Sequence, residues 1–147
     1  MNPFRHVLVA VDFGPSSARA LELAMKLVEG GDASLTLGHV VEIPSFAYVG
    51  MSFSAGDLVG PIEEAARAQL AALLASVRKR VASADAVLRR GYPSDELLEL
   101  ARESLADVIV IGTHGRLGVP HLFLGSVAEK VVRHSTVPVI TVRSAEP

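Results

Sequence analysis

Short apolar runs rich in β-branched residues alternate along this chain with longer segments in which apolar residues recur every three or four positions. The runs at residues 5–11 and 107–111 contain HVLVAV and DVIVI, and continuous runs of this kind are typical of strands buried on both faces. Alternating strand and helix units form a parallel sheet with helices packed on its faces. The sequence therefore predicts an α/β protein.

The pattern predicts five strands, at residues 5–11, 34–41, 86–90, 107–111 and 137–142. Four helices are expected between them, the first from Pro15 to Gly30, the second from Pro61 to Arg80, the third capped by Ser94, and the fourth begun by Gly125 and Ser126. Residues 42–60 have no clear period and are predicted to be a loop that contains at most one turn of helix. A loop of that length is often functional, so it is a candidate lid at the carboxyl edge of the sheet.

Composition excludes several classes of protein. The 147 residues are expected to form one domain, 1–147, since a chain of this size buries enough apolar surface to fold. The absence of cysteine excludes disulfides and thiolate metal sites, and it fits the cytoplasm, the expected location. The start lacks signal-peptide features and no apolar run reaches the roughly 18 residues of a membrane span, so no membrane partner is expected. A formal charge of -2 argues against nucleic acid as a partner.

The stretch GTHGRLGVPHLFLGS, at residues 112–126, is the main candidate site. It leaves the carboxyl end of a predicted buried strand and enters a helix, and ligands bind at that edge of open α/β sheets. Unpaired backbone amides and the positive end of the helix macrodipole suit phosphate there. Gly125 and Ser126 occupy this helix start, where the Ser126 hydroxyl can donate to a phosphate oxygen or cap the helix.

Gly112, Gly115 and Arg116 complete this candidate phosphate loop. The two glycines permit turns close to a ribose or phosphate, and Arg116 either screens phosphates or is solvated. The stretch has no lysine between Gly112 and Gly125, and the chain lacks both GxxxxGK[ST] and a GxGxxG after the first strand. A P-loop NTPase and a dinucleotide-binding Rossmann domain are therefore not supported.

Three polar residues at strand ends or in loops are further candidates for the site. Asp12 follows the first strand, where it either caps the first helix or contacts sugar hydroxyls, directly or through Mg²⁺. His114 and His121 lack an evident set of partner ligands and are interpreted as polar loop residues. No catalytic residue and no protein metal site are predicted.

The spacing Gly112-x2-Gly115-x9-Gly125-Ser126 resembles the ATP-binding signature of the universal stress protein family. The resemblance extends to the strand ending in Asp12, to GSVAEKVV at 125–132 and to PVITVR at 138–143. It implies an open five-stranded parallel sheet of order 3-2-1-4-5, Rossmann-like and adenine nucleotide alpha hydrolase-like, with helices on both faces. It also implies a homodimer formed through the fifth strand.

The same resemblance implies a set of nucleotide-binding residues. Asp12 would lie near the ribose or adenine, and Val40 and Val41 near the adenine edge. The residues expected around the ribose and phosphates are Gly112, Gly115, Arg116, Gly125, Ser126 and Val127. The implied ligand is ATP, with ADP and AMP as alternatives and Mg²⁺ as an accompanying ion.

The leading hypothesis is a regulatory or stress-response protein in which ATP occupancy biases a dimer or lid. Slow ATP hydrolysis and a ligand-free dimerisation module of the same fold are the alternatives. An adenylate-transforming enzyme would need an SGGxDS-type loop where DFGPS stands at 12–16, and a phosphorylated receiver would need an aspartate near Gly91 and a lysine near Arg143. The apolar residues of the fifth strand, Val139 and Ile140 among them, favour a paired edge and hence the homodimer.

Overall fold

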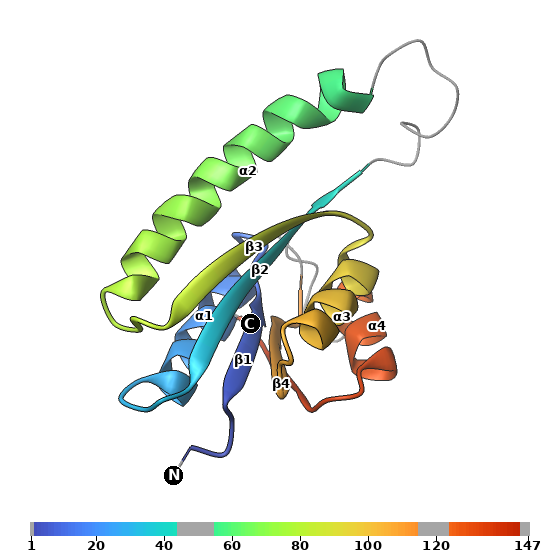
Figure 1. Cartoon of the computed structure of the whole chain (residues 1–147). Coiled ribbons are helices and arrows are strands. Elements are labelled where there is room, and N and C mark those ends of the chain that lie inside the picture. The colour runs from blue at the N-terminus through green and yellow to red at the C-terminus, as the bar shows by residue number, and fades with distance from the viewer. Residues whose placement is uncertain (1, 44–54, 115–123, 145–147) are drawn as a thin grey trace.

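The computed structural model describes residues 2–43, 55–114 and 124–144, without the side chains of 55–58. Five parallel strands form one sheet in the order β3-β2-β1-β4-β5 (Figure 1). The central strand β1 (His6–Ala10) pairs with β2 (Ser34–Glu42) and β4 (Val108–Gly112), while β3 (Ala84–Gly91) and β5 (Val139–Val142) are the edges. The predicted α/β class and strand order 3-2-1-4-5 are confirmed.

Four helices cover the two faces of the sheet (Figure 1). Helices α1 (Pro15–Val28) and α2 (Ala55–Arg78) pack on one face, and α3 (Pro93–Glu103) and α4 (Ser126–His134) on the other. Within the described residues, none of these helices is both long and apolar enough to cross a bilayer.

Side chains of β1 alternate between two separate cores. Val7 and Val9 point into the α1/α2 core, whereas Leu8 and Ala10 point into the α3/α4 core. Val7, Leu8 and Val9 have no exposed surface. The continuous apolar run at 5–11 is therefore explained by burial on both faces, as predicted.

Helix α2 begins earlier than the sequence predicts. It starts at Ala55, so the prediction of a loop through residue 60 and of Pro61 as the first helical residue was wrong. Proline inside a helix removes one hydrogen bond and costs about 3 kcal/mol. Val59 offsets part of that cost, because it is buried against Val41 and Ala66. The candidate lid at residues 44–54 lies outside the described residues.

Three other boundaries also differ from the sequence prediction. Ser94 is not the cap of α3, since Tyr92 holds that position with Pro93 at the first turn and Ser94 is buried. Strand β3 is longer than the predicted 86–90, because all eight of its residues pair with β2. Strand β5 is shorter than the predicted 137–142 and begins after Pro138, whose carbonyl accepts a hydrogen bond from Ile109 N.

Candidate functional site

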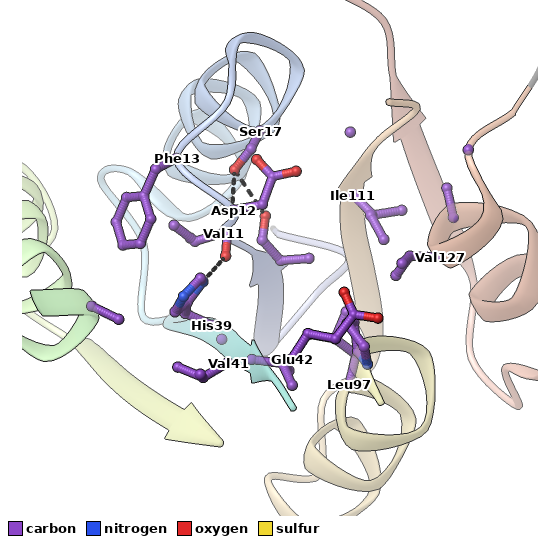
Figure 2. A pocket seen from close by; sticks show the side chains of 18 of the residues that line it. Val11, Asp12, Phe13, Ser17, His39, Val41, Glu42, Leu97, Ile111 and Val127 are labelled. Atoms are coloured by element: carbon purple, nitrogen blue, oxygen red, sulfur yellow. Dashed lines mark hydrogen bonds between the residues drawn. The ribbon is translucent and has the colours of Figure 1, made fainter. Parts of the chain in front are cut away.

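A pocket of about 620 Å³ opens at the carboxyl edge of the sheet, where β1, β2 and β4 end (Figure 2). After β1 the chain turns to α1 on one face, and after β4 it turns to α4 on the other, so the pocket lies where strand order reverses. Seven of the nine predicted site residues line it: Asp12, Val40, Val41, Gly112, Gly125, Ser126 and Val127. The other two, Gly115 and Arg116, lie outside the described residues.

Asp12 is held in the turn between β1 and α1. Its Oδ1 accepts a hydrogen bond from Gly14 N at 2.8 Å, and its own backbone N donates to Ser17 Oγ at 3.0 Å. Ser17 Oγ in turn donates to the carbonyl of Ala10 at 3.3 Å. One carboxylate oxygen therefore holds the turn before α1, where Gly14 and not Asp12 is the N-cap residue, so the prediction of Asp12 as the helix cap was wrong, while the carboxylate still lines the pocket.

The start of α4 presents uncapped backbone amides. Gly125 is the N-cap residue and no side chain of the described residues caps it, although its own N donates to the carbonyl of Thr113 at 2.6 Å. The amides of Ser126 and Val127, in the first turn, have no intrahelical acceptor by position. Because both residues line the pocket, the positive end of the helix macrodipole lies at the pocket wall. This arrangement suits an anion.

The two described glycines of the signature are also required for packing. A Cβ on Gly112 would lie 2.8 Å from Ser16 C and 2.9 Å from Ser17 N, and a Cβ on Gly125 would lie 2.8 Å from the carbonyl oxygen of Thr113. All three distances are below those that real Cβ atoms tolerate. These glycines let the strand β4 exit approach α1 and α4 closely, whether or not a ligand is present.

The residues that line the pocket come from both faces of the sheet, and we call the two groups the α1/α2 lobe and the α3/α4 lobe (Figure 2). On the α3/α4 side lie Val40, Leu97 and Ile111, which belong to the core under those helices. On the α1/α2 side lie Phe13, His39, Val41 and the α2 residues Ile62, Ala65, Ala66 and Gln69. Val127, at the start of α4, packs against the α3/α4 core, so this helix start belongs to the α3/α4 lobe.

The charged side chains in the described lining are acidic. Asp12 and Glu42 contribute carboxylates, and that part of the lining includes neither lysine nor arginine. Among residues 2–43, 55–114 and 124–144, no three His, Cys, Asp or Glu side chains gather as a metal-binding group. Within the described lining, the groups that can hold an anion are therefore backbone amides and hydroxyls.

His114 is fixed beside the pocket by two neighbours. Its Nδ1 lies 2.9 Å from Thr113 Oγ1, and its carbonyl accepts a hydrogen bond from Ser16 Oγ at 2.6 Å. Its Nε2 is buried and has no hydrogen-bond partner within the described part of the chain. The bond from Ser16 ties the strand β4 exit to the first turn of α1.

Comparison with known proteins places this fold and pocket in a family. The sequence model described as the Universal stress protein family matches residues 3–143. The chain belongs to this family. The "Universal stress protein in QAH/OAS sulfhydrylase 3'region" of Thermus aquaticus is 35% identical over 142 residues, covering 95% of this chain and 99% of the relative. Universal stress protein YxiE of Bacillus subtilis is 29% identical over 147 residues, covering 95% and 99%.

Solved universal stress protein structures share the fold. MJ0577 of Methanocaldococcus jannaschii superposes with a TM-score of 0.82 at 21% identity, covering 97% of this chain and 98% of the other. A universal stress protein solved in complex with cAMP gives a TM-score of 0.68 at 26% identity, covering 97% and 99%.

The pocket residues that the sequence did not predict include Phe13, Ser17, His39 and Glu42. Ser17 falls inside the helix predicted from Pro15, and its position there does not indicate a pocket. His39 offers a usable signal, because it is a polar residue near the carboxyl end of a predicted strand. The sequence contains no comparable signal for Phe13, since its ring reaches the pocket through a backbone φ of 65° that the sequence does not reveal.

Proposed function

We propose that this universal stress protein binds an adenine nucleotide in the carboxyl-edge pocket and that occupancy, rather than turnover, is its regulatory signal. The observation that carries the proposal is the uncapped start of α4, whose amides at Ser126 and Val127 border the pocket. A pocket of about 620 Å³ is large enough for a nucleotide. The relative solved in complex with cAMP supports an adenine nucleotide as the ligand class.

In this proposal, phosphate oxygens accept hydrogen bonds from the α4 amides and the Ser126 hydroxyl. Asp12 contacts the ribose or adenine, Val40 and Val41 lie at the adenine edge, and Gly112 and Val127 border the ribose and phosphates. Gly115 and Arg116 are proposed to complete the phosphate site. ATP is the proposed ligand, with ADP and AMP as alternatives.

Mg²⁺ is proposed to accompany a di- or triphosphate. Magnesium in nucleotide sites is commonly bound by one or two carboxylates together with the phosphates and water. Asp12 fits that donor set, because Gly14 N occupies only its Oδ1 among the described residues. When bound, the ion would supply positive charge between the phosphates and the acidic lining.

Substitution of Ser126 tests the phosphate site. Ser126→Pro removes both the hydroxyl and the amide at the first helical position, where proline is favoured. Gly125 has φ -59° and ψ 156°, which a residue before proline readily adopts. The helix should therefore remain intact while the affinity for AMP and ATP, measured by titration calorimetry, falls about tenfold or more. Adenosine, which has no phosphate, should bind as before.

Ser126→Ala is the matched control, because it removes the hydroxyl and keeps the amide. It should weaken AMP less than Ser126→Pro does. Unchanged AMP affinity in Ser126→Pro, with an unaltered circular dichroism spectrum, would place the phosphate elsewhere. Absence of nucleotide binding by the wild-type protein at millimolar ATP would leave the ligand-free dimerisation module as the better account.

We also propose that the chain forms a homodimer through β5. The two edges of the sheet differ in protection. Strand β3 carries Arg89 and Arg90, which pair with Glu96 on α3 and Glu63 on α2. Strand β5 consists of VITV and has no charged residue. An unprotected apolar edge favours a partner strand.

Thr141→Pro tests this dimer. Val142 O accepts from Thr113 N, and Pro138 O accepts from Ile109 N, so the alternation of a parallel strand turns the Thr141 N–H toward the free edge. Proline at this position removes an outward donor and spares the β4 ladder. Light scattering should show a dimer for wild type and for Thr141→Val, and a monomer for Thr141→Pro. A monomeric wild type would refute the dimer.

A further inference from the structure

The α1/α2 lobe of the pocket combines an aromatic wall with a hydrogen-bonding group. The rings of Phe13 and His39 lie 4.7 Å apart at 54°, and both line the pocket (Figure 2). We propose that His39 selects the base of the bound nucleotide, with its Nε2 accepting a hydrogen bond from the 6-amino group of adenine. This inference rests on the proposed nucleotide function and names a specificity residue for it.

The hydrogen bond at Nδ1 fixes the tautomer of neutral His39. Nδ1 lies 2.6 Å from the carbonyl oxygen of Val11. A carbonyl oxygen has no proton to donate, so Nδ1 carries the proton. In the neutral ring, Nε2 is then an acceptor only. The side chain therefore presents one kind of hydrogen-bonding group.

The acceptor nitrogen is available in the described part of the chain. No described group bonds His39 Nε2, and this atom is not among the buried polar atoms that lack a partner. Because His39 is only partly buried and lines the pocket, the open side of its ring faces the cavity. An acceptor in this position pairs with the amino group at C6 of adenine and opposes the carbonyl oxygen at C6 of hypoxanthine or guanine.

Small and apolar side chains complete the α1/α2 lobe. Helix α2 contributes Ala65 and Ala66 to the pocket lining. Val41 lies beside them and is buried. Planar bases stack on aromatic rings and pack against methyl groups, so the lobe matches a purine in shape and polarity.

The other lobe contains a competing acceptor, Glu42. Its carboxylate lies near Leu97 on the α3/α4 side (Figure 2). Glu42 is exposed to solvent, whereas His39 is partly buried and held by Val11. A solvated carboxylate discriminates weakly between bases, because water replaces a lost hydrogen bond there. Since His39 is more enclosed and its ring is oriented, it should discriminate between bases more strongly than Glu42 does.

Two substitutions of His39 separate recognition of the base from the structural hydrogen bond to Val11. His39→Asn keeps an N–H near the Nδ1 position, where it can still donate to Val11, and removes Nε2. His39→Gln keeps an acceptor near the Nε2 position and removes the Nδ1 donor. The ligands are AMP and IMP, which differ at C6 of the base, and affinities are measured by titration calorimetry on the full chain.

The wild type should prefer AMP over IMP by about tenfold to a hundredfold. In His39→Asn that ratio should fall toward one through loss of AMP affinity, and in His39→Gln and Glu42→Gln it should remain. Equal weakening of AMP and IMP in His39→Asn would overturn base reading and indicate a supporting role only. An unchanged ratio in His39→Asn, or a ratio lost in Glu42→Gln instead, would also overturn it. A wild type that binds neither ligand would refute the proposed nucleotide function itself.

Discussion

The amino and carboxyl edges of the sheet treat their polar groups differently. At the amino edge, Asp107 accepts the backbone N–H groups of Arg5 and His6 at 2.7 and 3.2 Å. The His6 ring lies between Thr36 Oγ1, at 2.7 Å from Nε2, and Ser34 Oγ, at 3.1 Å from Nδ1. Strand starts and ring nitrogens at this edge are therefore satisfied by the chain itself.

The carboxyl edge leaves comparable groups open. Among the residues that the structure describes, no side chain caps the start of α4, and partners occupy only Oδ1 of Asp12 and Nδ1 of His39. Groups that would stabilise the chain are instead directed at a cavity. Polar residues at the amino edge therefore serve stability, whereas Asp12, His39 and the α4 start at the carboxyl edge keep groups available to a ligand.

Substitution of Gly112 should give the largest change in stability. Gly112 lies at the carboxyl edge and yet serves packing, so it is an exception to the difference between the two edges. Gly112→Val places a branched side chain against the backbone of Ser16 and Ser17, so it should lower the unfolding free energy by about 3 kcal/mol. Urea unfolding measures the loss. The control Gly60→Ala meets no group within 4 Å beyond its chain neighbours, but Pro61 follows it and disfavours a helical residue that has a Cβ, so its unfolding free energy should change by less than about 1 kcal/mol. Equal stability of the two variants would contradict the packing at Gly112.

Asp107 tests the amino edge directly. Asp107→Ala leaves the Arg5 and His6 amides without their acceptor, and since this site is partly exposed the expected loss is about 1–2 kcal/mol of unfolding free energy. Nucleotide affinity should not change, because Asp107 lies at the opposite end of β4 from the pocket. Urea unfolding and calorimetric titration with AMP check the two halves of this expectation. A variant of normal stability that binds AMP poorly would reverse the comparison.

Asp12 should show the complementary behaviour. Asp12→Asn keeps the Oδ1 acceptor for Gly14 N and removes the negative charge, so stability should change little. The affinity for adenosine should fall about fivefold if Asp12 accepts from a sugar hydroxyl. Comparison with 2′-deoxyadenosine and 3′-deoxyadenosine identifies the hydroxyl. A large loss of stability with unchanged affinity would make Asp12 a turn residue only.

His6 should give the smallest effect, a pH dependence of stability at the amino edge. Burial lowers the pKa of His6 below its ordinary value of 6.5, although the charges of Asp107 and Asp85 oppose the shift. The unfolded chain therefore binds a proton more readily than the folded chain, so this contribution to stability is present above pH 6.5 and decreases as the pH falls below it. His6→Gln should flatten that slope in urea titrations. A slope equal to that of wild type would exclude His6 as its source.

Much of the fold was predictable because burial leaves a local pattern. Apart from His6, strands β1 and β4 consist of apolar residues and glycine, and their runs in the sequence match strands covered on both faces. The start of α2 was not predictable, because Pro61 is a strong local signal for a helix start and the opposing signal, Val59 packed on Val41, exists only after folding. Local patterns therefore locate elements better than their ends.

The site was predictable where its chemistry is consecutive in sequence. Gly125, Ser126 and Val127 form a helix start that the glycine spacing indicated, and the structure places them at the pocket. Phe13 and His39 come from different elements, and their pairing depends on how β1 and β2 end side by side. The lining of the two lobes also depends on the positions of α2 and α3 against the sheet, which no single segment of the sequence specifies.

The bond from Ser16 to His114 joins residues 98 positions apart, and it closes the pocket between the first and last parts of the chain. On a ribosome, the β1 side of the pocket emerges long before the α4 side. A ligand that contacts both Asp12 and Ser126 can bind only after α4 has been made and docked. Nucleotide would thus stabilise the finished chain by mass action and give no help to an incomplete one.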